Sequence, residues 1–436
     1  MVQPLFIPTA QPTRIPQSYA DEAEAQFAAG NLKAAISAYQ KATQAEPKNL
    51  DYMVALARIQ IFAEQYTDAL ASAQLSLLIA PNDVKSRAIY AWAIDWNVTN
   101  GCSCKTLAEA ESAAVTAIAL DANYAPAHAY YSEILNDGGK WQQGFQEAQT
   151  ASRLAPDLLE SERALGYANE SVGNYQAAID HYKAALKINP NLISLYLALG
   201  LNYRVLLNYD QAIYYFSKAN AIDPTNVQPY LYLSRTHYQN DELGTAIQYL
   251  QQALQLEPAN PDIHGRLGLI LFKKRNYEGA EPELRLAVLG GVVDGKGNPL
   301  LDDTGNPLKD ASGNAVVSAD GQTLQVPALP LNGAVTLEYY YTYGNLLAYL
   351  TKCKPYQAPR ILQLALNFRP DDPTVKASYQ ESMSICNGTL TANQAIYGTA
   401  TPVGAATPAG ATPVGTVATG AQATTQASKP TATGTP

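Results

Sequence analysis

Small side chains recur along this chain at an interval of 34 residues, with one longer interval of 41 residues in the third unit. The first set occupies the eighth position of successive units, at Ala23, Ala57, Ala91, Ser132, Gly166, Gly200, Ser234 and Gly268. A second set occupies the twentieth position, at Ala35, Ala69, Ala110, Gly144, Ala178, Ala212, Ala246 and Ala280. Small residues allow two antiparallel helices to cross closely, so this pattern predicts one pair of helices in each unit.

Bulky side chains and prolines complete the unit. Aromatic residues or leucine stand at the twenty-fourth position, where they are expected to fill the space beside the small residues, at Tyr39, Tyr182, Phe216, Leu250 and Leu284. A proline ends the second helix and suits the first turn of the next one, at Pro47, Pro81, Pro156, Pro190, Pro224 and Pro258. The pattern predicts helix pairs over residues 16–49, 50–83, 84–124, 125–158, 159–192, 193–226 and 227–260, then 261 to about 290 and about 337 to 372.

These residues resemble the tetratricopeptide repeat family, and the resemblance covers roughly 330 residues. It implies an all-α fold, namely a right-handed superhelical solenoid of about nine helix-turn-helix repeats. In such a solenoid the first helices line a concave groove that gathers protein partners. We therefore expect a protein or peptide partner, or a second copy of the chain, to bind in this groove.

The positions that form the groove in this family select eleven residues, which are Trp92, Trp96, Tyr130, Arg163, Tyr167, Arg204, Arg235, Tyr238, Arg266, Lys273 and Tyr341. Aromatic rings between guanidinium groups indicate a site for an acidic or C-terminal peptide. A merely solvated face is the alternative. The Lys/Asn/Arg clamp of chaperone-binding members is not reproduced, because the ninth position carries Tyr167, Leu201, Arg235 and Leu269.

Departures from the repeat divide the chain further. We expect an extended arm over 1–18, repeats over 19–290 with an insertion at 97–106, and a ninth repeat with a capping helix over 334–388. Glycines at Gly297, Gly305, Gly313 and Gly321 alternate with short apolar runs and predict a small β-meander over 291–333. Residues 389–436 are rich in Thr, Ala, Gly and Pro, which predicts an extended or disordered tail that carries glycans if the protein is exported.

Acidic residues accompany the glycines of the predicted meander, at Asp294, Asp302, Asp303 and Asp310. A calcium site is one interpretation, but no stretch fits the acidic loop of an EF-hand. Aspartates that accept hydrogen bonds within turns are the interpretation that we favour.

The four cysteines fall into two pairs. Cys102 and Cys104 share one loop, whereas Cys353 and Cys386 take similar positions in successive repeat units. This arrangement favours disulfides and an oxidising compartment. Reduced thiols in the cytosol are the alternative, and the spacing matches no usual zinc site.

Charge and hydropathy limit the partners. The formal net charge is −9, which argues against binding to nucleic acid or to an anionic membrane surface. No apolar run reaches the length of about 18 residues that a membrane-spanning helix needs. The segment from Val2 to Pro8 lacks the basic flank of a signal peptide and is compatible with an export segment upstream. Triplets that begin at Asn97, Asn169 and Asn387 match the acceptor pattern for N-glycosylation.

The sequence offers no catalytic constellation. The histidines His128, His181, His237 and His264 belong to four different repeats, and no phosphate-binding loop or nucleophile motif is present. We expect no enzyme activity, cofactor or metal. The favoured function is a non-enzymatic scaffold that is exported or displayed at the cell surface. One alternative is a subunit of an extracellular filament, linked by its N-terminal arm and β-insertion. A second alternative is a cytosolic adaptor.

Overall fold

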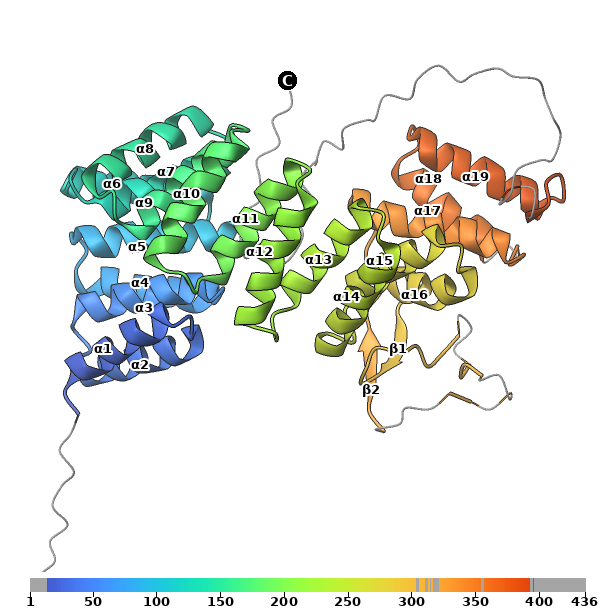
Figure 1. The fold of residues 1–436 in the computed structure, drawn as a ribbon, viewed down its shortest axis with the longest axis horizontal. Coiled ribbons are helices and arrows are strands. Elements are labelled where there is room, and N and C mark those ends of the chain that lie inside the picture. Colours follow the sequence, from blue (N-terminus) through green and yellow to red (C-terminus); the bar gives the residue numbers. More distant parts are fainter. Residues whose placement is uncertain are drawn as a thin grey trace, which may run out of the picture. The chain divides into compact units, whose positions relative to one another are not determined.

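The computed structural model describes residues 14–302, 306–309, 313, 315–316, 321–353, 357–392 and 395, and most of these residues are helical (Figure 1). The predicted N-terminal arm up to Thr13 and the tail after Ala395 lie outside the described residues. Contacts divide the chain into unit 1, which runs to Asp223, and unit 2, which begins at Pro224.

Unit 1 consists of antiparallel helix pairs. Its helices are α1 (Pro16–Ala28), α2 (Leu32–Ala45), α3 (Leu50–Phe62), α4 (Tyr66–Ile79), α5 (Val84–Thr99), α6 (Leu107–Leu120), α7 (Ala125–Asp137), α8 (Trp141–Leu154), α9 (Leu159–Ser171), α10 (Tyr175–Ile188), α11 (Ile193–Val205) and α12 (Tyr209–Ile222). Odd-numbered helices are the first helices of their pairs. Each first helix packs against the second helix of its own pair, and consecutive pairs pack against each other.

Unit 2 continues the same hairpins and adds a short sheet. Its elements are α13 (Val227–Gln239), α14 (Leu243–Leu256), α15 (Pro261–Lys273), α16 (Tyr277–Leu289), β1 (Gly291–Asp294), β2 (Thr323–Val326), α17 (Ala334–Tyr349), α18 (Ala358–Phe368) and α19 (Pro373–Cys386). The expected all-α repeat fold is confirmed over the described residues.

The helix pairs interlock through the predicted small residues. A Cβ atom built on Gly166 meets the ring of Tyr182 at 2.6 Å, and one built on Gly200 meets the ring of Phe216 at 2.4 Å. The alanines at the twentieth position are fully buried, for example Ala178. Because the large side chain of the second helix occupies the space beside the small residue, the two backbones approach closely.

Helix termini follow the same period. Side chains of Asn49, Asp83, Asn226 and Asn260 accept hydrogen bonds from backbone N–H groups in the first turn of the helix that follows each of them. These caps satisfy donors that the helix itself leaves unpaired. The first helices then end at residues with positive φ, such as Gly139 and Gly173.

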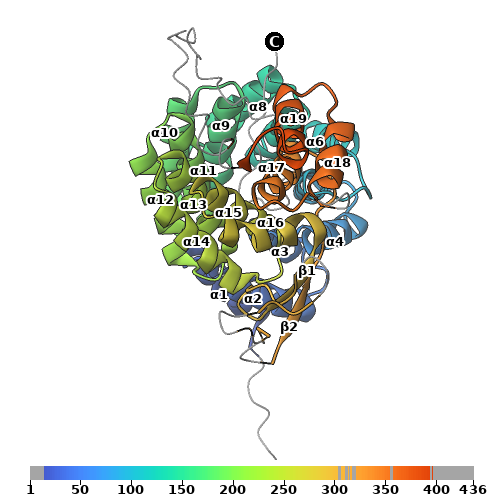
Figure 2. The ribbon, with the colours of Figure 1, turned by 90° about the vertical axis from the view of Figure 1, so that its right-hand side faces the viewer.

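The sequence predicts a β-meander for the inserted segment, but the described residues form one two-stranded sheet and three isolated bridges. β1 and β2 pair antiparallel, with Gly291 opposite Val326 and Asp294 opposite Thr323, and they extend beyond α16 (Figures 1 and 2). Isolated bridges recur every eight residues, as Val293 with Pro299, Leu301 with Pro307 and Lys309 with Ala315. Proline lacks an N–H donor and each repeated unit is short, so the bridges do not extend into full strands.

The predicted capping helix corresponds to α19 in unit 2. α19 packs against α17 and α18, and the three helices cluster in both views (Figures 1 and 2). Val375 and Ile385 enter the core, and Asn345 exchanges hydrogen bonds with Ser378 at 3.1 Å and Ser382 at 2.8 Å. These contacts cover the apolar surface that the last repeat would otherwise expose. Within the described part of the chain, no helix combines the length and the apolar character required to cross a membrane.

Candidate functional site

Four of the expected groove residues are buried within unit 1, and a fifth, Arg163, is mostly buried. Trp92, Trp96, Tyr130, Arg163 and Tyr167 lie on α5, α7 and α9, where Trp92 is 0% exposed and the Arg163 side chain is 11% exposed. The rings of Trp92 and Tyr130 stack with their centroids 4.3 Å apart, and the Arg163 guanidinium lies 4.9 Å from the Trp92 ring centroid. These side chains pack against one another instead of lining an open groove, which corrects the placement expected from the family.

Carboxylates balance the arginines in this interior. Glu133 accepts a hydrogen bond from Trp92 Nε1 at 2.7 Å and forms an ion pair with Arg163. Arg58 forms an ion pair with Glu160, whose side chain is 2% exposed. Burial by itself lowers the pKa of the Arg58 guanidinium, but Glu160, Tyr130 and Glu24 together raise it by more, so the net shift of that pKa is upward. Buried charges require such pairing, so these residues have a structural function.

The first repeat meets the connection between α10 and α11. Asn189 Nδ2 donates to the Phe27 carbonyl at 3.3 Å, and Asn191 Nδ2 donates to the Ala28 carbonyl at 2.8 Å. A Cβ atom on Gly30 would lie 2.8 Å from the Asn191 carbonyl oxygen. The helix pairs of unit 1 therefore follow a curved path, which brings the first hairpin into contact with a segment about 160 residues later in the sequence. This closure explains why the first-helix side chains inside it are buried.

Arg204 differs from the other candidates in unit 1. It lies near the end of α11, it is partly exposed, and its guanidinium is 5.9 Å from the ring centroid of Phe216. A planar guanidinium over an aromatic face gains cation–π attraction. The remaining five candidates all belong to unit 2.

In unit 2, Arg235 and Arg266 lie on the first helices α13 and α15. Arg266 Nε donates to Asp262 at 2.7 Å, and the same carboxylate accepts from the Tyr339 hydroxyl at 2.7 Å. Arg235 is exposed and has neither a hydrogen bond nor an ion pair with any other described residue. The structure thus leaves one guanidinium on this surface with its donors available.

Aromatic residues and a second cation extend this surface. Lys273 Nζ lies 4.4 Å from the Tyr238 ring centroid and 3.2 Å from a carboxylate oxygen of Asp241. Tyr341, on α17, is partly exposed. We call Arg235, Tyr238, Arg266, Lys273 and Tyr341 the arginine face of unit 2.

The pKa values of Arg235 and Glu338 are shifted at the arginine face. Arg235 and Glu338 are both accessible to solvent. Surrounding protein nevertheless displaces enough water to lower the pKa of the Arg235 guanidinium, and the charge of Arg266 lowers it further. Desolvation also raises the pKa of the Glu338 carboxyl, although Arg266 and Arg235 oppose that shift. A charge that is accessible but poorly hydrated gains more from binding an opposite charge than a fully hydrated one does.

Sequence reasoning missed Glu338 and Asp262 as neighbours of these arginines. Helical spacing contained the signal, because Glu338 precedes the selected Tyr341 by three residues and Asp262 precedes Arg266 by four. Residues at these separations share a helix face. The groove positions of the repeat family include the cations and aromatic residues of this face but not the carboxylates beside them.

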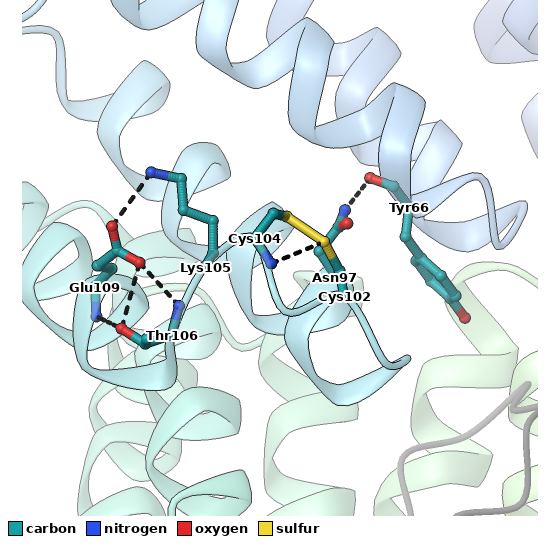
Figure 3. The surroundings of a disulfide bond; sticks show 7 residues. All are labelled: Tyr66, Asn97, Cys102, Cys104, Lys105, Thr106 and Glu109. Carbon is teal, nitrogen blue, oxygen red and sulfur yellow. Dashed lines mark hydrogen bonds and ion pairs between the residues drawn. A yellow bond between two sulfur atoms is a disulfide. The ribbon is translucent and has the colours of Figure 1, made fainter.

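The structure brings the four cysteines together as two pairs at disulfide distance. The structure joins Cys353, after α17, to Cys386 at the end of α19, with Cα atoms 5.2 Å apart. It joins Cys102 to Cys104 in the loop between α5 and α6, with Cα atoms 5.4 Å apart. Figure 3 shows that this second disulfide lies beside Asn97, whose side chain donates to the Tyr66 carbonyl, and that Lys105 reaches toward Glu109.

The histidines have structural partners. Nδ1 of His128, His181 and His264 lies 2.6, 2.8 and 2.6 Å from Glu147, Glu162 and Glu283, and each pair links the two helices of one repeat. His237 contacts Glu242 at 2.5 Å across an inter-helix turn. These four interactions orient the imidazole rings within the repeats.

The inserted aspartates organise turns where the structure describes them. Asp294 Oδ1 accepts backbone N–H groups from Lys296 at 2.9 Å and Asn298 at 2.8 Å, and Asp302 Oδ1 accepts from Asn306 at 2.9 Å. Such bonds are typical of turn aspartates. Asp303 and Asp310 lie outside the described residues.

The three glycosylation triplets differ in accessibility. Asn97 and Asn169 are buried, and the Asn169 side chain donates to the Leu165 carbonyl at 2.8 Å. Asn387 is exposed at the end of α19. An attached glycan requires an accessible side chain, so in the folded protein only the third of these asparagines meets that requirement.

Antiparallel helix pairs that interlock through small residues define a helical-repeat protein of the kind that presents first-helix faces to partners. Two family models described as "Tetratricopeptide repeat" match the sequence, one at residues 26–93 and 239–289 and the other at 164–192. The chain is accordingly a tetratricopeptide repeat protein. No curated protein matches the chain in sequence.

Solved structures share the fold. The chain is similar to the structure titled "Crystal structure of APC/C hetero-tetramer Cut9-Hcn1", with a TM-score of 0.52 and 16% identity; the match covers 80% of this chain but 59% of that one. It is also similar to the human IFIT1 dimer with PPP-AAAA, with a TM-score of 0.53, 14% identity and coverage of 85% and 83%. At these identities the likeness establishes the fold alone.

Proposed function

We propose that the protein is a non-enzymatic scaffold that binds an acidic or C-terminal peptide on the arginine face of unit 2. The fold is one that binds protein partners. We choose this surface because of the state of Arg235. This residue is exposed, its guanidinium has no hydrogen bond or ion pair with another described residue, and burial by neighbouring groups lowers its pKa. By contrast, the aromatic candidates Trp92, Trp96, Tyr130 and Tyr167 of unit 1 are buried.

The chemistry of this face fits a carboxylate ligand. A guanidinium binds a carboxylate through two parallel hydrogen bonds, and the interaction strengthens where water is partly excluded. Arg266 adds positive potential, although Asp262 already engages it. Tyr238 and Tyr341 supply aromatic surface that packs against apolar side chains of a peptide.

A peptide array tests this proposal. The probes are decapeptides made in two forms, one with a free C-terminal carboxylate and one with a C-terminal amide, together with variants that carry internal Asp or Glu. Binding of the intact protein is measured by fluorescence anisotropy. We expect Arg235→Ala to weaken binding of the selected acidic peptides at least tenfold. Lys296→Ala removes an exposed cation in the inserted segment of unit 2 and serves as the control.

Equal affinity of wild type and Arg235→Ala would refute this surface. A loss of binding with both variants would show instead that general positive charge, and not this guanidinium, attracts the peptides. The amide series separates recognition of a chain terminus from recognition of acidic side chains.

The compartment belongs to the same proposal. We infer that the protein is exported or displayed at the cell surface, since Cys353 and Cys386 lie at disulfide-bonding positions and such bonds persist in oxidising compartments. Alkylation of thiols in cells before lysis, followed by mass spectrometry, tests this inference. Four alkylated cysteines would favour a cytosolic adaptor.

A filament subunit is the second candidate. β2 has one strand neighbour, β1, in the described sheet, so its other edge carries backbone groups available for strand addition. Electron microscopy of native material would detect filaments. Deletion of residues 1–18 should abolish them while leaving a folded monomer, and an unchanged filament would exclude a linking role for the arm.

A further inference from the structure

We propose that Cys102 and Cys104 form a redox-active pair that exchanges disulfides with peptide dithiols. One residue, Ser103, separates them, and both lie in the loop between α5 and α6. Their bond therefore connects no two helices and constrains little chain. Cys353–Cys386 differs, because it ties the segment after α17 to the end of α19 across a sequence separation of 33.

Exposure distinguishes the two sulfur-bearing residues. Cys104 and Ser103 are exposed, and Cys102 is partly buried. The backbone N–H of Cys102 donates to the Asn97 carbonyl at 3.0 Å, so Cys102 is anchored to the end of α5. Cys104 is thus the sulfur that an external thiolate reaches more readily. Exposed disulfides are the more easily reduced and exchangeable class.

A hydrogen bond favours Cys102 as the leaving group. The backbone N–H of Cys104 lies 3.3 Å from Cys102 Sγ and points its donor at that sulfur (Figure 3). A donor of this kind stabilises a thiolate more than a neutral thiol, and a more stable thiolate leaves faster. Lys105 contributes less, because its ammonium lies 3.2 Å from Glu109 and is largely neutralised there.

The exchange balances in two steps. A peptide thiolate attacks Cys104 Sγ, the Cys102–Cys104 bond breaks, and its electron pair leaves on Cys102 Sγ. The second peptide thiolate then attacks the peptide sulfur of the mixed disulfide and releases Cys104 as a thiolate. The peptide dithiol loses two electrons and two protons to become a disulfide, while the protein gains two electrons and takes two protons from water.

The hairpin of α7 and α8 offers a surface that a peptide can contact. An open cavity of about 810 Å³ is lined by Tyr131, Leu135, Trp141 and the glutamines Gln142, Gln143 and Gln146. It also contains Glu111 of α6, which pairs with Lys140 at 2.8 Å, so the cavity adjoins the helix that follows the cysteine loop. Aromatic rings and side-chain amides are suited to a peptide backbone and its apolar side chains. We therefore assign peptide dithiols as the substrate class.

The first experiment compares the two disulfides within one protein. Full-length protein is equilibrated anaerobically in glutathione buffers of graded ratio, quenched by alkylation and mapped by mass spectrometry. At a given buffer ratio, the reduced-to-oxidised ratio of Cys102–Cys104 should exceed that of Cys353–Cys386 at least 100-fold. Equal ratios, or earlier reduction of Cys353–Cys386, would overturn the proposal.

The second experiment measures exchange directly. The probe is a reduced decapeptide with two cysteines and one leucine, mixed with stoichiometric oxidised protein, and dithiothreitol is the small dithiol for comparison. Cys104→Ser should lower the rate of peptide oxidation at least tenfold, whereas the double variant Cys353→Ser/Cys386→Ser should retain the wild-type rate. Trp141→Ala should slow oxidation of the peptide at least threefold and leave that of dithiothreitol unchanged. An unaltered rate in Cys104→Ser, or an equal effect of Trp141→Ala on both dithiols, would contradict the assignment.

Discussion

Leu207 occupies a backbone conformation that favours glycine. Its φ is +58°, and the side chain is 70% exposed, so it has little packing to compensate. Gly139 and Gly173 hold the corresponding position at the ends of α7 and α9, with φ of +75° and +81°. A left-handed conformation costs a residue with a Cβ atom roughly 1–2 kcal/mol.

Leu207→Gly should therefore stabilise unit 1. The free energy of unfolding should rise by up to about 1 kcal/mol, since relief of the left-handed conformation exceeds the entropy that glycine gains in the unfolded chain. Urea unfolding followed by tryptophan fluorescence measures it. Leu206→Gly is the matched control, because Leu206 is exposed with φ of −75° and glycine there should destabilise. Changes of the same sign in both variants would contradict this explanation.

His128 makes stability depend on pH. Its hydrogen bond to Glu147 raises the pKa of the imidazole, with burial and Arg153 opposing the shift. The folded pKa thus exceeds the value of about 6.5 expected in the unfolded chain. The added stability is fully present below that unfolded value and is lost as the pH rises through the folded pKa.

The difference in urea midpoint between wild type and His128→Gln should accordingly be larger at pH 5 than at pH 8. Glu147→Gln keeps the shape of the partner while removing its charge, so this variant should lose most of the pH dependence. A difference that is constant across this range would show that the pair contributes through packing alone. The 19-residue spacing shared by three His–Glu pairs is the sequence signal that would have predicted them.

Between helices, the fit of small residues to large ones determines how closely each pair packs. Gly268 on α15 faces Leu284 on α16, and an added Cβ atom would lie 2.6 Å from Leu284 Cγ and 3.0 Å from its backbone nitrogen. The backbone cannot yield as a side chain does. Overpacking at such a site costs about 1–3 kcal/mol.

Gly268→Ala should lower the free energy of unfolding of unit 2 by about 1–3 kcal/mol. Gly244, in α14, is the control, because a Cβ atom there meets nothing within 4 Å. Gly244→Ala should stabilise unit 2 by up to about 1 kcal/mol through helix propensity alone. Hydrogen exchange of amides in α14–α16 measures both. Equal destabilisation by the two alanines would mean that crowding at Gly268 is not the cause.

The same elements show what the sequence can and cannot predict. The helix pairs and their interlocking residues were predictable because they depend on spacings within about 34 residues. The buried interior of unit 1 was not, since closure depends on small rotations added over several repeats. Trp92 and Tyr130 have the sequence pattern of groove residues, but the structure buries both, and Asn189 and Asn191 join the first hairpin to a segment about 160 residues later.

For the molecule as a whole, the division into two units has no local sequence signal. Unit 2 begins at Pro224, yet Pro190 occupies the equivalent position inside unit 1. Each unit has buried clusters of its own, such as Ala164, Leu165 and Ala168 in unit 1 and Leu250, Ile263 and Leu267 in unit 2. A protein built in this way is expected to unfold in more than one step, as repeat arrays do when cooperativity is incomplete.

The chain carries separate reporters for these steps. All three tryptophans, Trp92, Trp96 and Trp141, belong to unit 1, whereas Cys353–Cys386 belongs to unit 2. Replacing both cysteines, Cys353→Ser/Cys386→Ser, releases a loop of sequence separation 33. The chain-entropy estimate for a loop of that size is about 3–4 kcal/mol. Hydrogen exchange in α17 and α19 should accelerate accordingly, while the urea midpoint reported by tryptophan fluorescence should remain that of the wild type. If the fluorescence midpoint falls together with protection in α19, the two units unfold as one cooperative body and the proposed independence is wrong.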